Sequence, residues 1–91
     1  MITAIVFIQA DVAHLNETAE QIADIVGVSE VYSVTGELDL LAMVRVRTHE
    51  DIAAVVADQI NKVEGVLATQ TQIAFQTFSQ HDLEEAFSIG T

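Results

Sequence analysis

One stretch decides the fold: Val31-Tyr-Ser-Val-Thr-Gly-Glu-Leu-Asp-Leu-Leu-Ala-Met-Val-Arg-Val46. Two apolar, strand-like runs lie on either side of Thr35-Gly-Glu-Leu-Asp39. Because Gly36 has no Cβ, the chain can adopt a positive φ there and reverse direction. The stretch therefore predicts a β-hairpin. Asp39 stands where the turn meets the second strand, so its carboxylate can accept a hydrogen bond from a backbone amide or a ligand amine.

The segment before the hairpin predicts a strand followed by an amphipathic helix. Residues 3–9 form a nearly continuous apolar run rich in β-branched side chains, which is typical of a strand buried on both faces. Gly27 can then end a helix in the left-handed conformation. Five apolar residues at helical spacing predict the buried face of this helix: Leu15, Ala19, Ile22, Ala23 and Val26.

The segment after the turn repeats the pattern. Residues 40–46 are nearly all apolar and predict a central strand, and Thr48-His-Glu-Asp51 has the form of a helix N-terminal capping box. We expect the helix to end at Gly65 and a long last strand to cover residues 66–78. The apolar face of this second helix consists of Ile52, Val55, Val56, Ile60 and Val63.

Together these elements predict an α+β fold, a ferredoxin-like βαββαβ sandwich in which residues 1–91 form one domain. The first and third strands are the most apolar and should be central, with the second (residues 28–34) and fourth at the edges. This order allows both crossovers to be right-handed. A second cap-like motif, Ser79-Gln-His-Asp82, and the apolar residues Leu83, Ala86 and Phe87 predict a short C-terminal helix.

One face of the predicted sheet has no helix to cover it. In the first strand, the residues of both alternating sets are largely apolar, so the uncovered face should be apolar too. Such a face favours packing against another sheet. A face-to-face homodimer of the dimeric α/β-barrel type is the simplest arrangement, and a monomer with scattered exposed apolar residues is the alternative.

The composition narrows the classes of function. The net charge is −11, with 14 acidic residues against three basic ones, so direct DNA binding is not expected. The chain has no cysteine, and its three histidines are far apart, so no metal site or other cofactor is expected. Without a signal-like or membrane-spanning apolar segment, we expect a cytoplasmic protein. The acidity favours solubility, or attraction of a cationic group such as an amine.

Two segments resemble the effector-binding domain of Lrp/AsnC regulators, also called the RAM domain. The first runs from Gly27 to Val44 and contains Thr35-Gly-Glu-Leu-Asp39; the second begins at Val63 and contains Gly65-Val-Leu-Ala-Thr-Gln-Thr71. The resemblance covers residues 4–78. Full-length members of that family carry an N-terminal helix-turn-helix domain. Because the first predicted strand begins close to Met1, we expect no such domain in this chain, which resembles the stand-alone form.

The resemblance implies a small-molecule sensor that assembles with itself. It implies a homodimer, a ring of dimers, an amino acid or related metabolite bound between dimers, and co-assembly with full-length Lrp/AsnC-type regulators. By position, Gly36 would bring its backbone close to the effector and Asp39 would face its amine or orient the turn. The hydroxyls of Thr69 and Thr71 would meet a carboxylate or polar side chain. Weaker candidates for the pocket wall are Tyr32, Leu38 and Met43.

Simpler roles remain open for these residues. Gly36 can be a turn glycine only, Asp39 can bond to its own turn, and Tyr32 can serve packing alone. Thr69 and Thr71 favour strands in any case. For the whole chain, the alternatives are a purely structural oligomer and a cofactor-independent enzyme of the dimeric α/β-barrel type. We expect no enzyme, because the chain lacks Trp and its histidines stand at helix starts.

Overall fold

The computed structural model describes residues 1–78. Its strands are β1 (Ile2–Ala10), β2 (Val28–Ser33), β3 (Leu40–Val46) and β4 (Val66–Ile73). The short 3-10 helix η1 (Val12–His14) precedes α1 (Leu15–Ala23). The predicted C-terminal helix lies outside the described residues.

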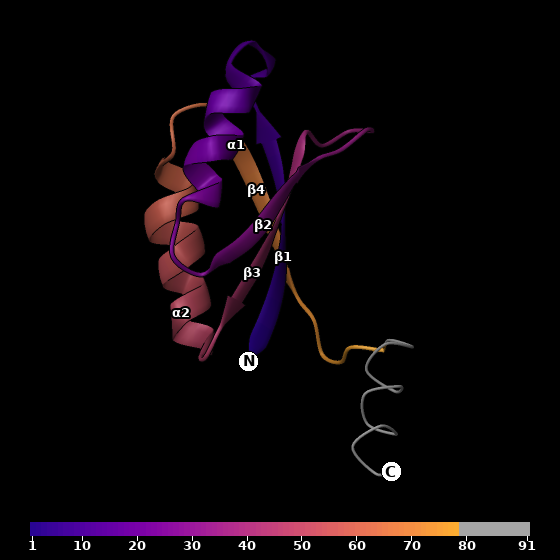
Figure 1. The fold of residues 1–91 in the computed structure, drawn as a ribbon, viewed down its shortest axis with the longest axis vertical. Helices are drawn as coiled ribbons and strands as arrows, with labels where there is room; N and C mark the ends of the chain where they lie inside the picture. The colour runs from indigo at the N-terminus through magenta and orange to yellow at the C-terminus, as the bar shows by residue number, and fades with distance from the viewer. Residues whose placement is uncertain (79–91) are drawn as a thin grey trace, which may run out of the picture.

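The four strands form one antiparallel sheet in the order β2-β3-β1-β4. This confirms the predicted βαββαβ fold, with the two most apolar strands at the centre. Both helical segments lie on the same side of the sheet, and its other face carries no element of this chain among the described residues (Figure 1).

The core lies between the sheet and the helices. Every second residue of the central strands points into it, because side chains alternate between the faces of a sheet. Ile22 from α1 and Ile60 from the second helical segment are fully buried against these strands. The strand residues of the core are Ala4, Val6, Ile8, Ala10, Leu40, Ala42, Val44 and Val46.

The opposite face of the central strands is the open sheet face, which we define by Ile5, Phe7, Leu41 and Met43. These four side chains are only partly buried in the single chain. The register pairs Ile5 with Met43 and Phe7 with Leu41, so the four residues adjoin one another. The predicted uncovered apolar face is therefore present.

The second helical segment differs from a regular α-helix. It consists of α2 (His49–Ala53), the π-helix η2 (Ala54–Gln59) and the 3-10 helix η3 (Ile60–Lys62). The predicted cap is confirmed, because the Thr48 hydroxyl accepts a 3.1 Å hydrogen bond from the Asp51 amide. Val55 of the π-helix and Ile60 of the 3-10 helix that follows still lie in the core.

The last strand is shorter than predicted. It ends at Ile73 instead of residue 78. The amide of Ala74 still donates to the Thr3 carbonyl at 2.9 Å. Because β1 begins at Ile2, the residues that follow have no neighbouring strand to pair with.

Candidate functional site

The turn of the hairpin is held firmly against the end of β1. The amide of Asp39 donates to the Ile8 carbonyl at 3.0 Å, and Asp39 Oδ2 accepts a 2.8 Å hydrogen bond from the Ala10 amide. The Val34 amide donates to the Asp39 carbonyl at 3.1 Å and closes the loop. Gly36 has φ of 111°, as the turn requires. The Asp39 side chain thus fixes the orientation of the turn by bonding to β1, at Ala10, which is 29 residues away in sequence. It does not bond to the backbone of its own turn.

A hollow of about 400 Å³ lies beside this turn, on the open sheet face, and we call it the hairpin hollow. Leu38 lies in its wall, while Thr35 and Glu37 supply a hydroxyl and a carboxylate from the exposed turn. The hollow therefore offers an apolar surface with a hydrogen-bonding and anionic rim, which suits a small molecule that has an amine and an apolar part. Its lining residues are Phe7, Val34, Thr35, Glu37, Leu38 and Leu41.

The sequence-predicted site residues fall into two groups. Gly36, Leu38 and Asp39 belong to the hairpin turn. Tyr32 lies opposite Leu41 and Met43 opposite Ile5, so both belong to the open face that the hollow indents. These five are brought to one side of the sheet.

Thr69 and Thr71 lie on the other side. They are register partners of Ile8 and Val6, whose side chains point toward the helices. The Thr69 hydroxyl donates to Asn61 Oδ1 at 2.6 Å. Within one chain, these threonines are separated from the hairpin hollow by the sheet itself.

Of the six residues that line the hollow, only Leu38 was a predicted site residue. The other five are Phe7, Val34, Thr35, Glu37 and Leu41. Thr35 and Glu37 flank the turn glycine, and this adjacency was a signal for both. Phe7 comes from a strand 30 residues away in sequence from Glu37, so only the pairing of β1 with β3 reveals it.

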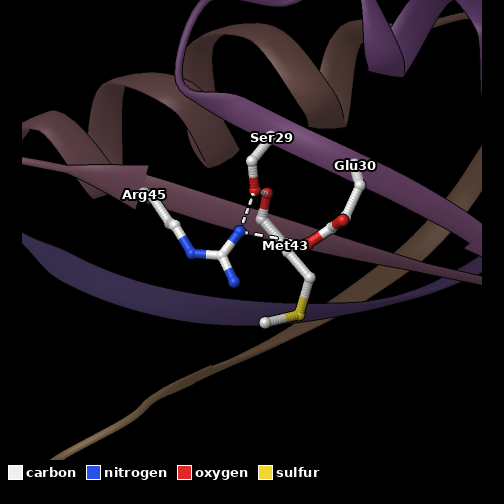
Figure 2. A network of polar contacts seen from close by, with 4 residues as sticks. All are labelled: Ser29, Glu30, Met43 and Arg45. Atoms are coloured by element: carbon white, nitrogen blue, oxygen red, sulfur yellow. Dashed lines mark hydrogen bonds and ion pairs between the residues drawn. The ribbon is translucent and has the colours of Figure 1, made fainter. Parts of the chain in front are cut away.

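A polar network borders the open face at the β2 edge (Figure 2). Arg45 donates to Glu30 Oε1 at 3.0 Å and also to the Ser29 hydroxyl, which in turn donates to the Met43 carbonyl at 3.1 Å. Arg45 thus forms an ion pair with Glu30 of its own chain.

This network also shifts two pKa values. The Arg45 guanidinium, followed by the Tyr32 hydroxyl, lowers the pKa of Glu30 by hydrogen bonding to its carboxylate. The same carboxylate, as a hydrogen-bond acceptor, raises the pKa of Tyr32.

A second hollow, of about 410 Å³, lies where α1 begins, and it is lined mainly by polar side chains, including Asp11, Glu17 and Glu64. Within residues 1–78, however, no three His, Cys, Asp or Glu side chains are grouped closely enough to hold a metal ion. In the same part of the chain, no helix is long and apolar enough to cross a membrane.

Comparison with known proteins adds the family context. Residues 3–83 match the sequence model of the Lrp/AsnC ligand binding domain. An uncharacterised HTH-type transcriptional regulator of Pyrococcus horikoshii is 45% identical over 64 residues, which make up 70% of this chain and 43% of that regulator. The chain therefore spans less than half the length of that relative.

Solved structures give the same relationship. The protein TTHA0845 from Thermus thermophilus is 41% identical and superimposes with a TM-score of 0.82 over 88% of this chain and all of that one. A transcriptional regulator of Neisseria meningitidis, solved as a complex with L-Met, superimposes with a TM-score of 0.77 over 87% of this chain and 53% of that one. Its identity of 18% shows a shared fold alone.

Proposed function

This chain belongs to the Lrp/AsnC ligand-binding domain family, and from that premise we propose that it binds a free amino acid, or a related small metabolite, in the hairpin hollow. The observation that carries the proposal is the position of the hollow against the turn 35–39, the segment on which the family resemblance rests. Binding there is the sensing step of a regulatory module.

The side chains around the hollow support this ligand class. Glu37 supplies a carboxylate for the ligand amine, and the turn contains no basic side chain that would compete for it. The Thr35 hydroxyl and the backbone amides of the turn are donors for the ligand carboxylate. Leu38 and Leu41 offer contact to an apolar ligand side chain. Asp39 acts indirectly, since its carboxylate is already bound to the Ala10 amide.

The Neisseria meningitidis relative supports the same class, because a regulator with this fold holds L-Met. The open sheet face supports self-assembly of this chain into dimers, and then into rings of dimers. Thr69 and Thr71 lie on the side of the sheet opposite to the hollow. They would contact a ligand only if it lies between two chains, where the threonines of one chain approach the hollow of another. Their place in the proposed site therefore depends on the ring.

The regulatory action is proposed to pass through protein partners. The Pyrococcus horikoshii relative is an HTH-type regulator, and this chain corresponds to 43% of it. With a net charge of −11, the chain would repel DNA phosphates, so we propose that it acts by co-assembling with full-length Lrp/AsnC-type regulators.

A purely structural oligomer is the second candidate. It is favoured by the fact that Asp39 and Thr69 already have hydrogen-bond partners within the chain. Both residues would then serve the fold alone, with no ligand to recognise.

The experiment is a thermal-shift screen of the twenty amino acids. A ligand at 100 times its dissociation constant adds about 2.7 kcal/mol to the free energy of unfolding, which is easily seen as a rise in Tm. Hits are repeated with Glu37→Gln, which removes the charge at the hollow, and with Glu17→Gln, which removes an exposed charge on α1.

We expect Glu37→Gln to abolish or strongly reduce the shift and Glu17→Gln to retain it. A shift that is equal in both variants would place the ligand elsewhere. If no amino acid raises Tm, the structural oligomer becomes the better account.

A further inference from the structure

The five residues that follow β4 carry two large side chains that are highly exposed in the part of the chain that the structure describes. We call residues 74–78 the arm. Phe75 is 103% exposed and Phe78 is 86% exposed. Beyond the bond from the Ala74 amide to Thr3, the arm runs away from the sheet and helices (Figure 1). Two exposed aromatic side chains on one short segment mark a surface that binds another molecule.

The arm leaves the domain at the end opposite the hairpin hollow. It departs beside Thr3, whereas the turn is held at Ile8. These β1 residues are about 17 Å apart, at ~3.4 Å per residue. Residues 75–78 span at most about 14 Å when fully extended. To return, the chain would also have to reverse within residues 74–78, which include neither Gly nor Pro. The hollow of the same chain is thus a poor destination for the arm.

A second copy of the chain avoids this difficulty. When two sheets pack face to face about a two-fold axis perpendicular to their strands, the strand directions are reversed, so the arm of each copy lies beside the hairpin of the other. The whole segment 66–78 has no charged residue in a chain of net charge −11. Two copies therefore meet least repulsion where this segment approaches the open sheet face.

The hairpin hollow can accept an aromatic ring. Its volume is about 400 Å³. An apolar cavity of roughly 150 Å³ already binds benzene. The hollow thus has room for a phenyl ring and a small ligand together, and Phe7, Leu38 and Leu41 provide apolar contacts for the ring.

We propose that Phe75 and Phe78 of a second copy of this chain lie over the hairpin hollow and complete its wall. The binding site is then composite: one copy supplies the turn 35–39 and its partner supplies the arm. This assignment rests on the proposed function only where it makes the hollow a ligand site. The contact between arm and hollow forms with or without a ligand.

The chain has no cysteine, which permits a direct test by disulfide cross-linking. One preparation carries Leu38→Cys, and a second, with an affinity tag, carries Phe78→Cys. The two are mixed, unfolded and refolded together, oxidised mildly and separated on a non-reducing denaturing gel. We expect a covalent heterodimer whose disulfide joins positions 38 and 78, identified by peptide mass spectrometry.

The matched control replaces Leu38→Cys by Val26→Cys, an 88% exposed position just before β2. We expect at least about a tenfold lower yield of the heterodimer with this control. Equal yields from the two mixtures would overturn the proposal. So would a 38–78 disulfide formed within one chain, when both substitutions are placed together in a dilute sample.

A second measurement needs no cysteine. Phe75→Ser with Phe78→Ser should raise the dissociation constant for self-association at least about tenfold, as expected for aromatic anchors at an interface. The circular dichroism spectrum should not change, because neither ring packs on its own domain. The control is Gln76→Ser with Thr77→Ser in the same arm. An unchanged dissociation constant in the phenylalanine variant would overturn the proposal. Because both tests are made without a ligand, their failure is distinct from a failed amino-acid screen.

Discussion

At the scale of single residues, Asp39 ties two distant segments together. Its carboxylate accepts the 2.8 Å hydrogen bond from the Ala10 amide at the end of β1. We predict that Asp39→Ala lowers the free energy of unfolding by about 1–3 kcal/mol, because it leaves a partly buried amide without an acceptor. Asp39→Asn retains an oxygen acceptor and should cost less. Urea unfolding measures both.

The control for this prediction is Glu37→Ala, two residues earlier in the same turn. Glu37 is exposed, so its truncation should change the free energy of unfolding by no more than about 0.5 kcal/mol. Equal losses in the Ala variants of Asp39 and Glu37 would contradict a specific role for the Asp39 hydrogen bond.

The single tyrosine gives a second residue-scale prediction. Tyr32 is the only Tyr and the chain has no Trp, so an ultraviolet absorbance titration reports Tyr32 alone. Its hydrogen bond to Glu30 raises its pKa, so it should ionise above the ordinary value. Glu30→Gln should lower the pKa of Tyr32 toward that value. Because the pKa of Tyr32 is higher in the folded state than in the unfolded state, the protonated side chain stabilises the fold. This stabilisation is complete below the unfolded-state pKa and is lost as the pH rises through the folded-state pKa.

The control for this titration is Glu37→Gln, which removes an equal charge from the hairpin turn. The pKa of Tyr32 should then stay close to that of the unsubstituted chain. If Glu30→Gln and Glu37→Gln shift it equally, the cause is general electrostatics and not the hydrogen bond.

At the scale of elements, Thr18 connects α1 to the turn that precedes β4. Thr18 is 1% exposed, and its hydroxyl donates to the Glu64 carbonyl at 3.0 Å. Gly65 has φ of 99°, and a Cβ at this position would meet the Thr18 hydroxyl. Gly36 also has a positive φ, but a Cβ there would meet no atom within 4 Å.

These two glycines form a matched pair of variants. Gly36→Ala should cost about 1–2 kcal/mol of unfolding free energy, the usual cost of a left-handed residue with a Cβ. Gly65→Ala should lower the free energy of unfolding by more, because the new Cβ would displace Thr18 in addition to causing the same backbone strain. Urea unfolding of both variants gives the comparison. A smaller loss for Gly65→Ala would mean that α1 moves aside without cost.

The element order was predictable because apolar residues recur along each strand and each helix at the spacing typical of that structure. Apolar runs marked β1 and β3 as central. The predicted helix ends were only approximate: the helical segments end at Ala23 and Lys62, three or more residues before Gly27 and Gly65, and Val26, predicted on the buried face of the first helix, is 88% exposed. The end of β4 was not predictable in this way. It depends on where β1 begins, which is a property of the partner strand. The π-helix η2 was also missed, since its apolar spacing fits a regular helix nearly as well.

The candidate site was less predictable than the fold. The turn 35–39 was recognisable from its residue types, but its partners were not, because Ala10 and Phe7 come from β1. The faces of Thr69 and Thr71 depend on the register of β4, and a shift of one residue would exchange them. Long-range pairing decides these features, and local sequence does not contain it.

At the scale of the whole molecule, the large negative charge of each copy opposes assembly. Each copy carries −11, and face-to-face sheets lie only about 10 Å apart. The Debye length falls from about 30 Å at 0.01 M salt to about 8 Å at 0.15 M. We therefore predict that association strengthens as salt is raised across this range, since screening removes repulsion while burial of Phe7, Leu41 and their neighbours is retained.

Light scattering coupled to gel filtration measures this prediction, and a pair of variants locates the interface. Phe7→Glu adds a charge at the centre of the open sheet face and should give a monomer at every salt concentration. Val12→Glu adds the same charge at a 74% exposed position in η1, away from the sheet, and should assemble like the unsubstituted chain. A monomer of the unsubstituted chain at all salt concentrations would refute sheet packing. Equal behaviour of the two variants would show that net charge, and not the open sheet face, controls assembly.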